Sequence, residues 1–118
     1  MKLRELLVAQ PALQELNRRK MPVKLAYAMA KNFRLVNQEL EDYEKARVKM
    51  LQDNWKVNPE TNKYEIPPED DAKATVMFDE LLDEQVDLPT VIKVTLTQLE
   101  GMELSPGEVE AISWMIEE

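Results

Sequence analysis

The sequence predicts an α+β fold that is mainly helical, and three observations lead to this prediction. Glycine occupies only two of 118 positions, which disfavours tight turns and a large β-structure. Apolar residues recur at helical spacing through most of the chain. Short runs with strand-like patterning are confined to the middle and the last third of the chain. We therefore expect one long helix, a β-hairpin plus a third short strand, and a capped C-terminal helix.

Two short helices are predicted before the long one. Leucines at helical spacing predict a helix near residues 2–9. Pro11 then predicts a restart, because proline is favoured at the first position of a helix. This second helix is expected to end near Asn17, and Pro22 is expected to open the next one.

The long helix is predicted for residues 22–54, which contain no glycine or proline after the first position. Its apolar residues alternate spacings of three and four, as in a heptad repeat. At 1.5 Å per residue it spans roughly 48 Å, whereas a compact domain of this size is only about 35 Å across. We therefore expect this helix to project, to bend, or to pair with a second copy or another protein. The predicted contact face consists of Met29, Phe33, Val36, Leu40 and Tyr43.

A hairpin and a further helix are predicted next. Residues 55–57 and 63–66 have the pattern of short strands, and the turn between them contains Pro59 and Asn62, which suits a left-handed conformation. Pro68 then begins a helix whose first turn is acidic, where the helix dipole favours negative charge. We expect this helix to close just before Pro89.

The last third of the chain predicts a strand and a capped helix. Residues 90–96 alternate apolar and polar side chains, and we expect this strand to add to the hairpin because an isolated hairpin is marginal. Ser105, Pro106 and Glu108 fit the N-cap, the first helical position and the capping-box partner of a final helix. The apolar side of that helix includes Met115.

Charge divides the chain, which we expect to form one domain, residues 1–118. Residues 1–58 hold 12 basic and 7 acidic side chains, and residues 59–118 hold 3 basic and 16 acidic ones, which together give the net charge of −8. The helical half, 1–54, is thus basic, and the half from 55 to 118, with hairpin, helix, strand and helix, is acidic. Such a chain can pair with itself head to tail or offer an acidic face to a basic partner.

Composition argues against several kinds of site. The chain contains no cysteine and no histidine, so thiol catalysis, thiolate zinc sites and the commonest general base are absent. It has no phosphate-binding glycine loop and no apolar run of the roughly 20 residues that span a bilayer. We expect no enzyme activity, no cofactor, no metal and no membrane association.

The segment from Tyr64 to Asp87 holds nine carboxylates and one lysine. Three explanations stay open: a solvated helix face, a protein-binding face, and a metal or catalytic site. The metal explanation is the weakest, because the segment lacks the turn glycine of a calcium loop. The candidate acidic contact face consists of two pairs spaced by one helical turn: Asp79 with Asp83, and Glu80 with Glu84.

Two further features have a structural and a functional explanation. Basic residues between Arg18 and Arg34 could contact phosphate, but a helix end followed by an exposed helix face is the favoured explanation. Trp55 and Trp114 are expected in the core. An exposed tryptophan would be the best candidate for a binding hot spot.

Three segments carry a resemblance to a known group of proteins. They are MPVKLAYAMAKNFRLVNQELEDYEKARVKMLQ, then NKYEIPPED with FDELLDEQVDL, then LEGMELSPGEVEAISWMI. In this order they resemble small proteins of unknown function encoded in phages and prophages of Gram-positive bacteria. The resemblance implies a viral origin and a location in the host cytoplasm, with the virion as the alternative. It carries no catalytic motif and implies no site residues.

These observations favour a non-enzymatic bacteriophage protein that acts through protein–protein contacts. Its partner would be a phage structural protein, a host protein, or a second copy in a homodimer, and we expect no direct contact with nucleic acid. The first alternative is an acidic inhibitor of a host nuclease or defence protein that imitates nucleic acid. The second and weaker alternative is an enzyme that uses carboxylates and a metal.

Overall fold

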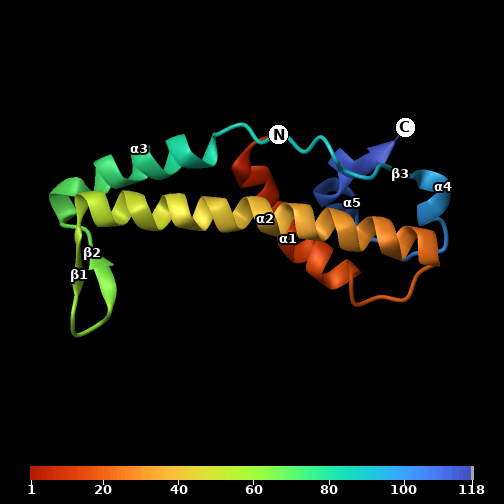
Figure 1. Ribbon diagram of the computed structural model, residues 1–118, viewed down its shortest axis with the longest axis horizontal. Coiled ribbons are helices and arrows are strands. Elements are labelled where there is room, and N and C mark those ends of the chain that lie inside the picture. Colours follow the sequence, from red (N-terminus) through yellow and green to blue (C-terminus); the bar gives the residue numbers. More distant parts are fainter. Residues whose placement is uncertain (118) are drawn as a thin grey trace.

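The long helix α2, Val23–Asn54, is the axis around which the other elements are arranged (Figure 1). The structure is a computed structural model and describes residues 1–117. It is α+β and mainly helical, as predicted. The other elements are α1 (Leu3–Leu16), β1 (Lys56–Asn58), β2 (Lys63–Glu65), η1 (Pro68–Asp70), α3 (Asp71–Leu82), β3 (Val94–Thr95), α4 (Leu96–Leu99), α5 (Pro106–Ala111), η2 (Ser113–Met115) and β4 (Ile116–Glu117).

The molecule is elongated to match α2. Its principal extents are 52 × 28 × 24 Å, and the helix of 32 residues accounts for most of the longest one. In Figure 1, α1 and the C-terminal elements lie against the first half of α2, and α3 runs back along the second half. The helix therefore neither projects nor needs a partner chain to cover its apolar side, because the rest of the chain is spread along it.

Helix α1 is continuous, so the predicted break at Pro11 is wrong. Its buried residues keep one helical stripe through the proline, from Leu3 and Leu6 to Leu13 and Leu16. Proline inside a helix costs roughly 3 kcal/mol, whereas each buried leucine contributes about 1.5–3 kcal/mol. Pro11 itself is exposed, so its ring does not disturb this packing.

Two separate apolar clusters hold the molecule together. The main cluster joins α1, the first half of α2 and the C-terminal elements, with Leu13, Met29 and Ile112 among its fully buried residues. A smaller cluster at the far end of α2 joins Leu51, Trp55 and Ala74, so it links α2, the hairpin and α3. Each half of α2 therefore has its own core.

The predicted hairpin is present, but the third strand does not join it. Strands β1 and β2 pair antiparallel, and Asn62 has the expected positive φ of 57°. Strand β3 instead pairs in parallel with β4 in a separate two-stranded sheet. The strand predicted for residues 90–96 is reduced to two residues because Thr95 caps helix α4.

The buried side chain of Asn32 explains why the strand does not begin earlier. Its amide donates to the carbonyl of Ile92 at 2.8 Å and accepts from the Ile92 N–H at 2.8 Å. Asn32 is fully buried, and its amide pairs both backbone groups of Ile92 where a neighbouring strand would otherwise do so. This contact fixes the segment before β3 to the first half of α2.

The capping box predicted at Ser105 and Glu108 is present. The Glu108 N–H donates to Ser105 Oγ at 3.1 Å, and the Ser105 N–H donates to Glu108 Oε1 at 3.1 Å. The helix is shorter than expected, because it ends at Ala111 and continues as a 3₁₀ turn that buries Met115. Among residues 1–117, no helix has the length and apolar character to cross a membrane.

Candidate interaction site

The face of α2 predicted to bind a partner is part of the protein's own core. Met29 and Val36 are completely buried. Phe33, Leu40 and Tyr43 are partly buried and pack against the main cluster. The heptad pattern was interpreted correctly as an apolar stripe, but α1 and the C-terminal elements cover it. The assignment of this face to a partner is therefore wrong for Met29 and Val36, which no partner can reach in the folded protein.

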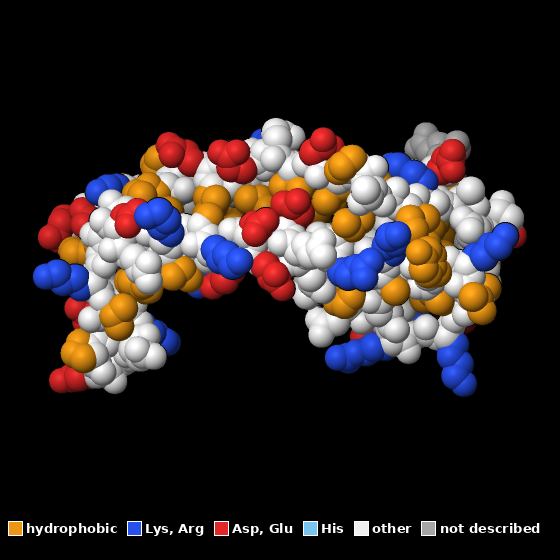
Figure 2. Space-filling model, viewed as in Figure 1, with side chains coloured by type: hydrophobic (Ala, Val, Ile, Leu, Met, Phe, Trp, Pro, Cys, Tyr) orange, Lys and Arg blue, Asp and Glu red, His pale blue; other side chains and the backbone are white. Residues whose placement is uncertain are grey.

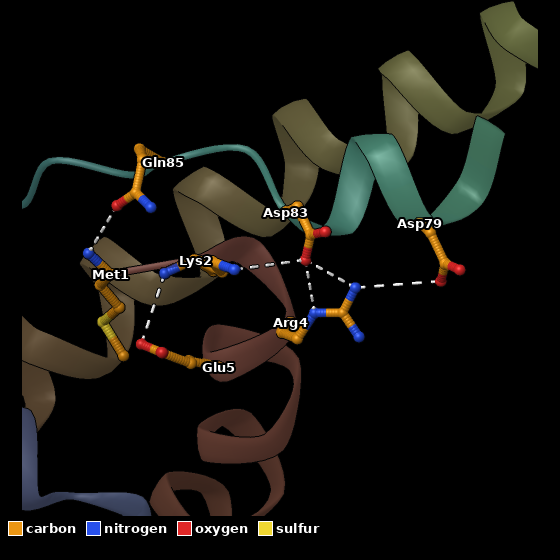
Figure 3. Close-up of polar contacts among 7 residues, drawn as sticks. All are labelled: Met1, Lys2, Arg4, Glu5, Asp79, Asp83 and Gln85. Atoms are coloured by element: carbon orange, nitrogen blue, oxygen red, sulfur yellow. Dashed lines mark hydrogen bonds and ion pairs between the residues drawn. The ribbon is translucent and has the colours of Figure 1, made fainter. Parts of the chain in front are cut away.

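Two of the four predicted acidic contact residues are paired within the chain (Figure 3). Arg4 donates from Nε to Asp83 Oδ1 at 2.9 Å, and its Nη2 lies 2.7 Å from the same oxygen. The same guanidinium lies 3.9 Å from Asp79, and Lys2 Nζ lies 3.7 Å from Asp83. We call this group of four residues the N-terminal clasp. It joins the start of α1 to the end of α3.

Backbone contacts support the clasp. The Leu3 N–H donates to the Glu84 carbonyl at 3.1 Å, and the Met1 carbonyl accepts from the Val86 N–H at 2.6 Å. Arg4 and Asp83 are each about half exposed, so their ion pair stabilises the fold by at most about 1 kcal/mol. The clasp therefore contributes little stability, and its main effect is to hold the end of α3 beside the start of α1. It also neutralises part of the negative charge of the predicted acidic face.

The other two predicted acids face a shallow groove between α2 and α3. Glu80 and Glu84 line it together with Met50, Met77 and Leu81. No ion pair of either glutamate is present within residues 1–117. The four acids thus differ in their neighbours: Asp79 and Asp83 lie beside basic side chains of the N-terminus, whereas Glu80 and Glu84 line the groove beside α2.

A groove of about 780 Å³ lies between α1 and α5. Its apolar lining comes from Met1 and Val8 on one side and from Ala111 and Trp114 on the other. Val8 is 69% exposed, although it lies in a helix with a buried apolar stripe. A concave apolar surface of this kind is the usual form of a binding site. We call it the α1–α5 groove.

Trp114 lines the groove and also packs against the main cluster, and its polar atom is already paired. The indole N–H donates to the Ala111 carbonyl at 2.8 Å, so a ligand does not need to satisfy it. Lys93 donates to the Trp114 carbonyl at 2.6 Å and fixes the backbone there. Trp114 is only partly buried, whereas Trp55 is buried as predicted and donates to Asp70 at 3.0 Å. Trp114 is therefore the better hot-spot candidate of the two.

A second unpartnered surface lies on the outer side of α2. Tyr27 is 63% exposed and Val23 is 85% exposed, and Lys31 lies 5.7 Å from the centre of the Tyr27 ring. Lys24 and Arg34 continue the same side of the helix. Figure 2 shows Lys and Arg side chains over the half of the molecule that holds α1 and the start of α2. We call these five residues the basic stripe.

The shifted pKa values belong to surface ion pairs and a helix cap. The pKa of Glu108 is lowered mainly by its hydrogen bond from the Ser105 backbone and also by the charge of Arg19, whose Nη2 lies 3.0 Å from Glu108 Oε2. A hydrogen bond from Arg47 lowers the pKa of Glu44. In both cases the neighbours stabilise the charged carboxylate, as in a structural contact.

Within residues 1–117, no group of three carboxylate side chains is close enough together to hold a metal ion. No protein-family model, curated protein or solved structure matches the chain. The described residues form an elongated, mainly helical molecule, and its candidate site is the α1–α5 groove, where apolar side chains lie beside charged ones.

Sequence reasoning missed this groove for a physical reason. Val8 and Trp114 are 106 positions apart in the sequence, and only the packing of α1 against α5 brings them together. A local signal did exist at Val8, because it lies off the buried stripe of α1 and still is apolar. For the basic stripe, the local signal in the sequence was the spacing of Lys24, Tyr27 and Lys31 by three and four residues, which places them on one side of a helix.

Proposed function

We propose that the chain is a non-enzymatic interaction protein of a bacteriophage and that its principal contact surface is the α1–α5 groove. The observation that carries this proposal is the apolar lining of the groove, with Val8 and Trp114 on opposite walls. The phage origin rests on the sequence resemblance described above. The expected ligand is an apolar segment of a partner protein.

The composition of the groove supports a protein ligand. A binding hot spot commonly combines a tryptophan with apolar residues near the centre and charged residues around them. The groove combines these residue types, because Arg4, Glu5 and Glu110 line it together with the apolar side chains. A partner segment with an apolar centre and polar ends would leave these charges in contact with water.

The alternative of an acidic inhibitor that imitates nucleic acid has less support. It requires the acids of α3 to project as one negative surface. Arg4 and Lys2 lie beside Asp79 and Asp83 and neutralise part of that surface. We therefore place the principal contact in the groove and not on the acidic face.

The proposal is tested by comparing Val8→Glu with Val57→Glu in a pull-down from cells that produce the protein. Both residues are exposed valines, at 69% and 43%, so both variants should fold. We expect Val8→Glu to lose the partner protein, because it adds a charge to an apolar contact. Val57→Glu should retain it. Equal recovery by both variants would contradict the proposal.

A further inference from the structure

The basic stripe of α2 is unusual in a chain with a net charge of −8. Residues 16–38 hold six basic side chains and no acidic one: Arg18, Arg19, Lys20, Lys24, Lys31 and Arg34. Of these, only Arg19 has an ion pair in the described part of the chain, with Glu108. The stripe also exposes Val23 and Tyr27, so it combines uncompensated charge with apolar surface.

Helix α3 carries the opposite pattern on its outer side. Val76 is 55% exposed and points away from the buried Ala74. Asp79 and Glu80 follow Val76 at helical spacing, Glu69 lies in η1 just before the helix, and all three are exposed. The only lysine of this helix, Lys73, lies 6.0 Å from the ring centre of Trp55. Residues 69–87 hold eight acidic side chains. The basic residues nearby are Lys73, Lys2 and Arg4, so the acids exceed them by five. We call this surface the acidic stripe.

We propose that the protein associates head to tail, with the basic stripe of one copy on the acidic stripe of the next. In an antiparallel alignment Tyr27 lies opposite Val76. Lys24, three residues before Tyr27, then faces Asp79, three residues after Val76. Arg34 then lies at the same end of the contact as Glu69, which belongs to the turn η1 that precedes α3. Apolar contact at the centre and opposite charges at both ends favour this one register.

The two stripes cannot meet within one molecule. Figure 1 places α3 beside the second half of α2, whereas the basic stripe belongs to the first half. In Figure 2, Asp and Glu side chains lie along the upper edge over α3, away from the basic end. Because the two contacting surfaces differ, the association is heterologous and leaves one free stripe at each end. The expected product is an open chain that lengthens with concentration.

The test is sedimentation velocity of the whole protein and of two charge-reversed variants at low salt. We expect the wild-type protein to form oligomers that dissociate as salt increases. The variant Lys24→Glu/Arg34→Glu and the variant Glu69→Lys/Asp79→Lys should each be monomeric, because like charges then face each other. An equimolar mixture of the two variants should associate again, since the reversed stripes complement each other. Refolding is checked by circular dichroism.

A control variant separates stripe contacts from net charge. Lys56→Glu/Lys63→Glu changes the charge by the same amount as Lys24→Glu/Arg34→Glu, but on the exposed hairpin. It should associate like the wild-type protein. A wild-type protein that stays monomeric at low salt would overturn the proposal, even if the basic stripe binds nucleic acid. So would a mixture of the reversed variants that stays monomeric. Neither result bears on the α1–α5 groove, which uses other residues.

Discussion

At the scale of single residues, Asn32 is the most consequential polar side chain. It is the only polar residue among the buried side chains of residues 1–117, and it occupies the apolar side of α2. Its amide pairs both backbone groups of Ile92, and its nitrogen also lies 3.6 Å from the Met115 sulfur. One side chain thus connects α2 with two segments of the C-terminal region.

We expect Asn32→Leu to destabilise the protein by about 2–4 kcal/mol. Leucine has a similar volume, so little cavity forms, but the N–H and the carbonyl of Ile92 lose their partners, and each unpaired buried group costs about 1–3 kcal/mol. Urea unfolding measures the change. Gln38→Leu, at an exposed position of the same helix, serves as the control and should have an effect within about 0.5 kcal/mol. An Asn32→Leu protein as stable as the wild type would contradict this role.

Glu108 is expected to contribute to the loss of stability in acid. Its pKa is lowered in the folded protein from an ordinary value of 4.5, chiefly by the hydrogen bond from the Ser105 backbone. A lowered pKa means that the folded protein holds the carboxylate more strongly than the unfolded chain does. This stabilisation is present above pH 4.5 and is lost as the pH falls through the lower folded pKa.

The variant Glu108→Gln therefore should lose less stability than the wild type as the pH falls below 4.5. Glutamine can keep the capping bond to the Ser105 N–H, so the helix should form in both proteins. The measurement is the urea midpoint at neutral pH and at about pH 3. Parallel losses in the two proteins would show that Glu108 titrates normally.

At the scale of elements, the two halves of α2 pack into clusters of different size, and we expect the half with the smaller cluster to be the less stable one. The main cluster contains most of the fully buried side chains, whereas the smaller one has only Leu51, Trp55 and Ala74 as buried members. Phe78 packs against the smaller cluster from α3. Fewer buried apolar contacts should allow α3 and the hairpin to open without unfolding the rest.

Amide hydrogen exchange of Phe78→Ala and Leu13→Ala tests this division. Phe78→Ala should increase exchange in α3 and the hairpin and leave α1 unchanged. Leu13→Ala lies in the main cluster and should increase exchange throughout, because it lowers the global free energy of unfolding by about 2–5 kcal/mol. If Phe78→Ala increases exchange equally in α1, the molecule has one cooperative core.

Elements that neighbouring residues determine were predictable from the sequence, and elements that depend on distant contacts were not. The long helix, the hairpin with Asn62, and the capping box at Ser105 were predictable because local residues determine them. The continuity of α1 and the position of β3 were not, because they depend on contacts far apart in the chain. The distant partner of Ile92 is Asn32, and no local pattern indicates that pair.

For the candidate site the same distinction applies. The apolar stripe of α2 was visible in the sequence, but whether a partner or the chain itself covers it depends on where α1 and α5 pack. The acidic residues of α3 were also visible in the sequence. The ion pair between Arg4 and Asp83, however, uses part of their charge for a contact within the molecule. The sequence therefore predicts which residues form an apolar or a charged pattern. Only the fold shows which of these patterns are exposed to solvent.

At the scale of the whole molecule, the protein is a rod about as long as α2 with separate surfaces along it. The α1–α5 groove is concave and lined by apolar and charged side chains, and the two stripes carry opposite charge near opposite ends. An elongated molecule with such surfaces can bind a partner protein in the groove and, through the stripes, align several copies. The groove is the central element of the proposed function.

The most direct test of this claim is photo-crosslinking in cells that produce the protein. A photoreactive amino acid replaces Val8 in the groove, and in a matched chain it replaces Val57, an exposed valine on the hairpin that is 43% exposed. The account predicts that position 8 forms a covalent adduct with one partner protein and that position 57 does not. Adducts of the same kind from both positions, or no protein adduct from position 8, would contradict the proposed function.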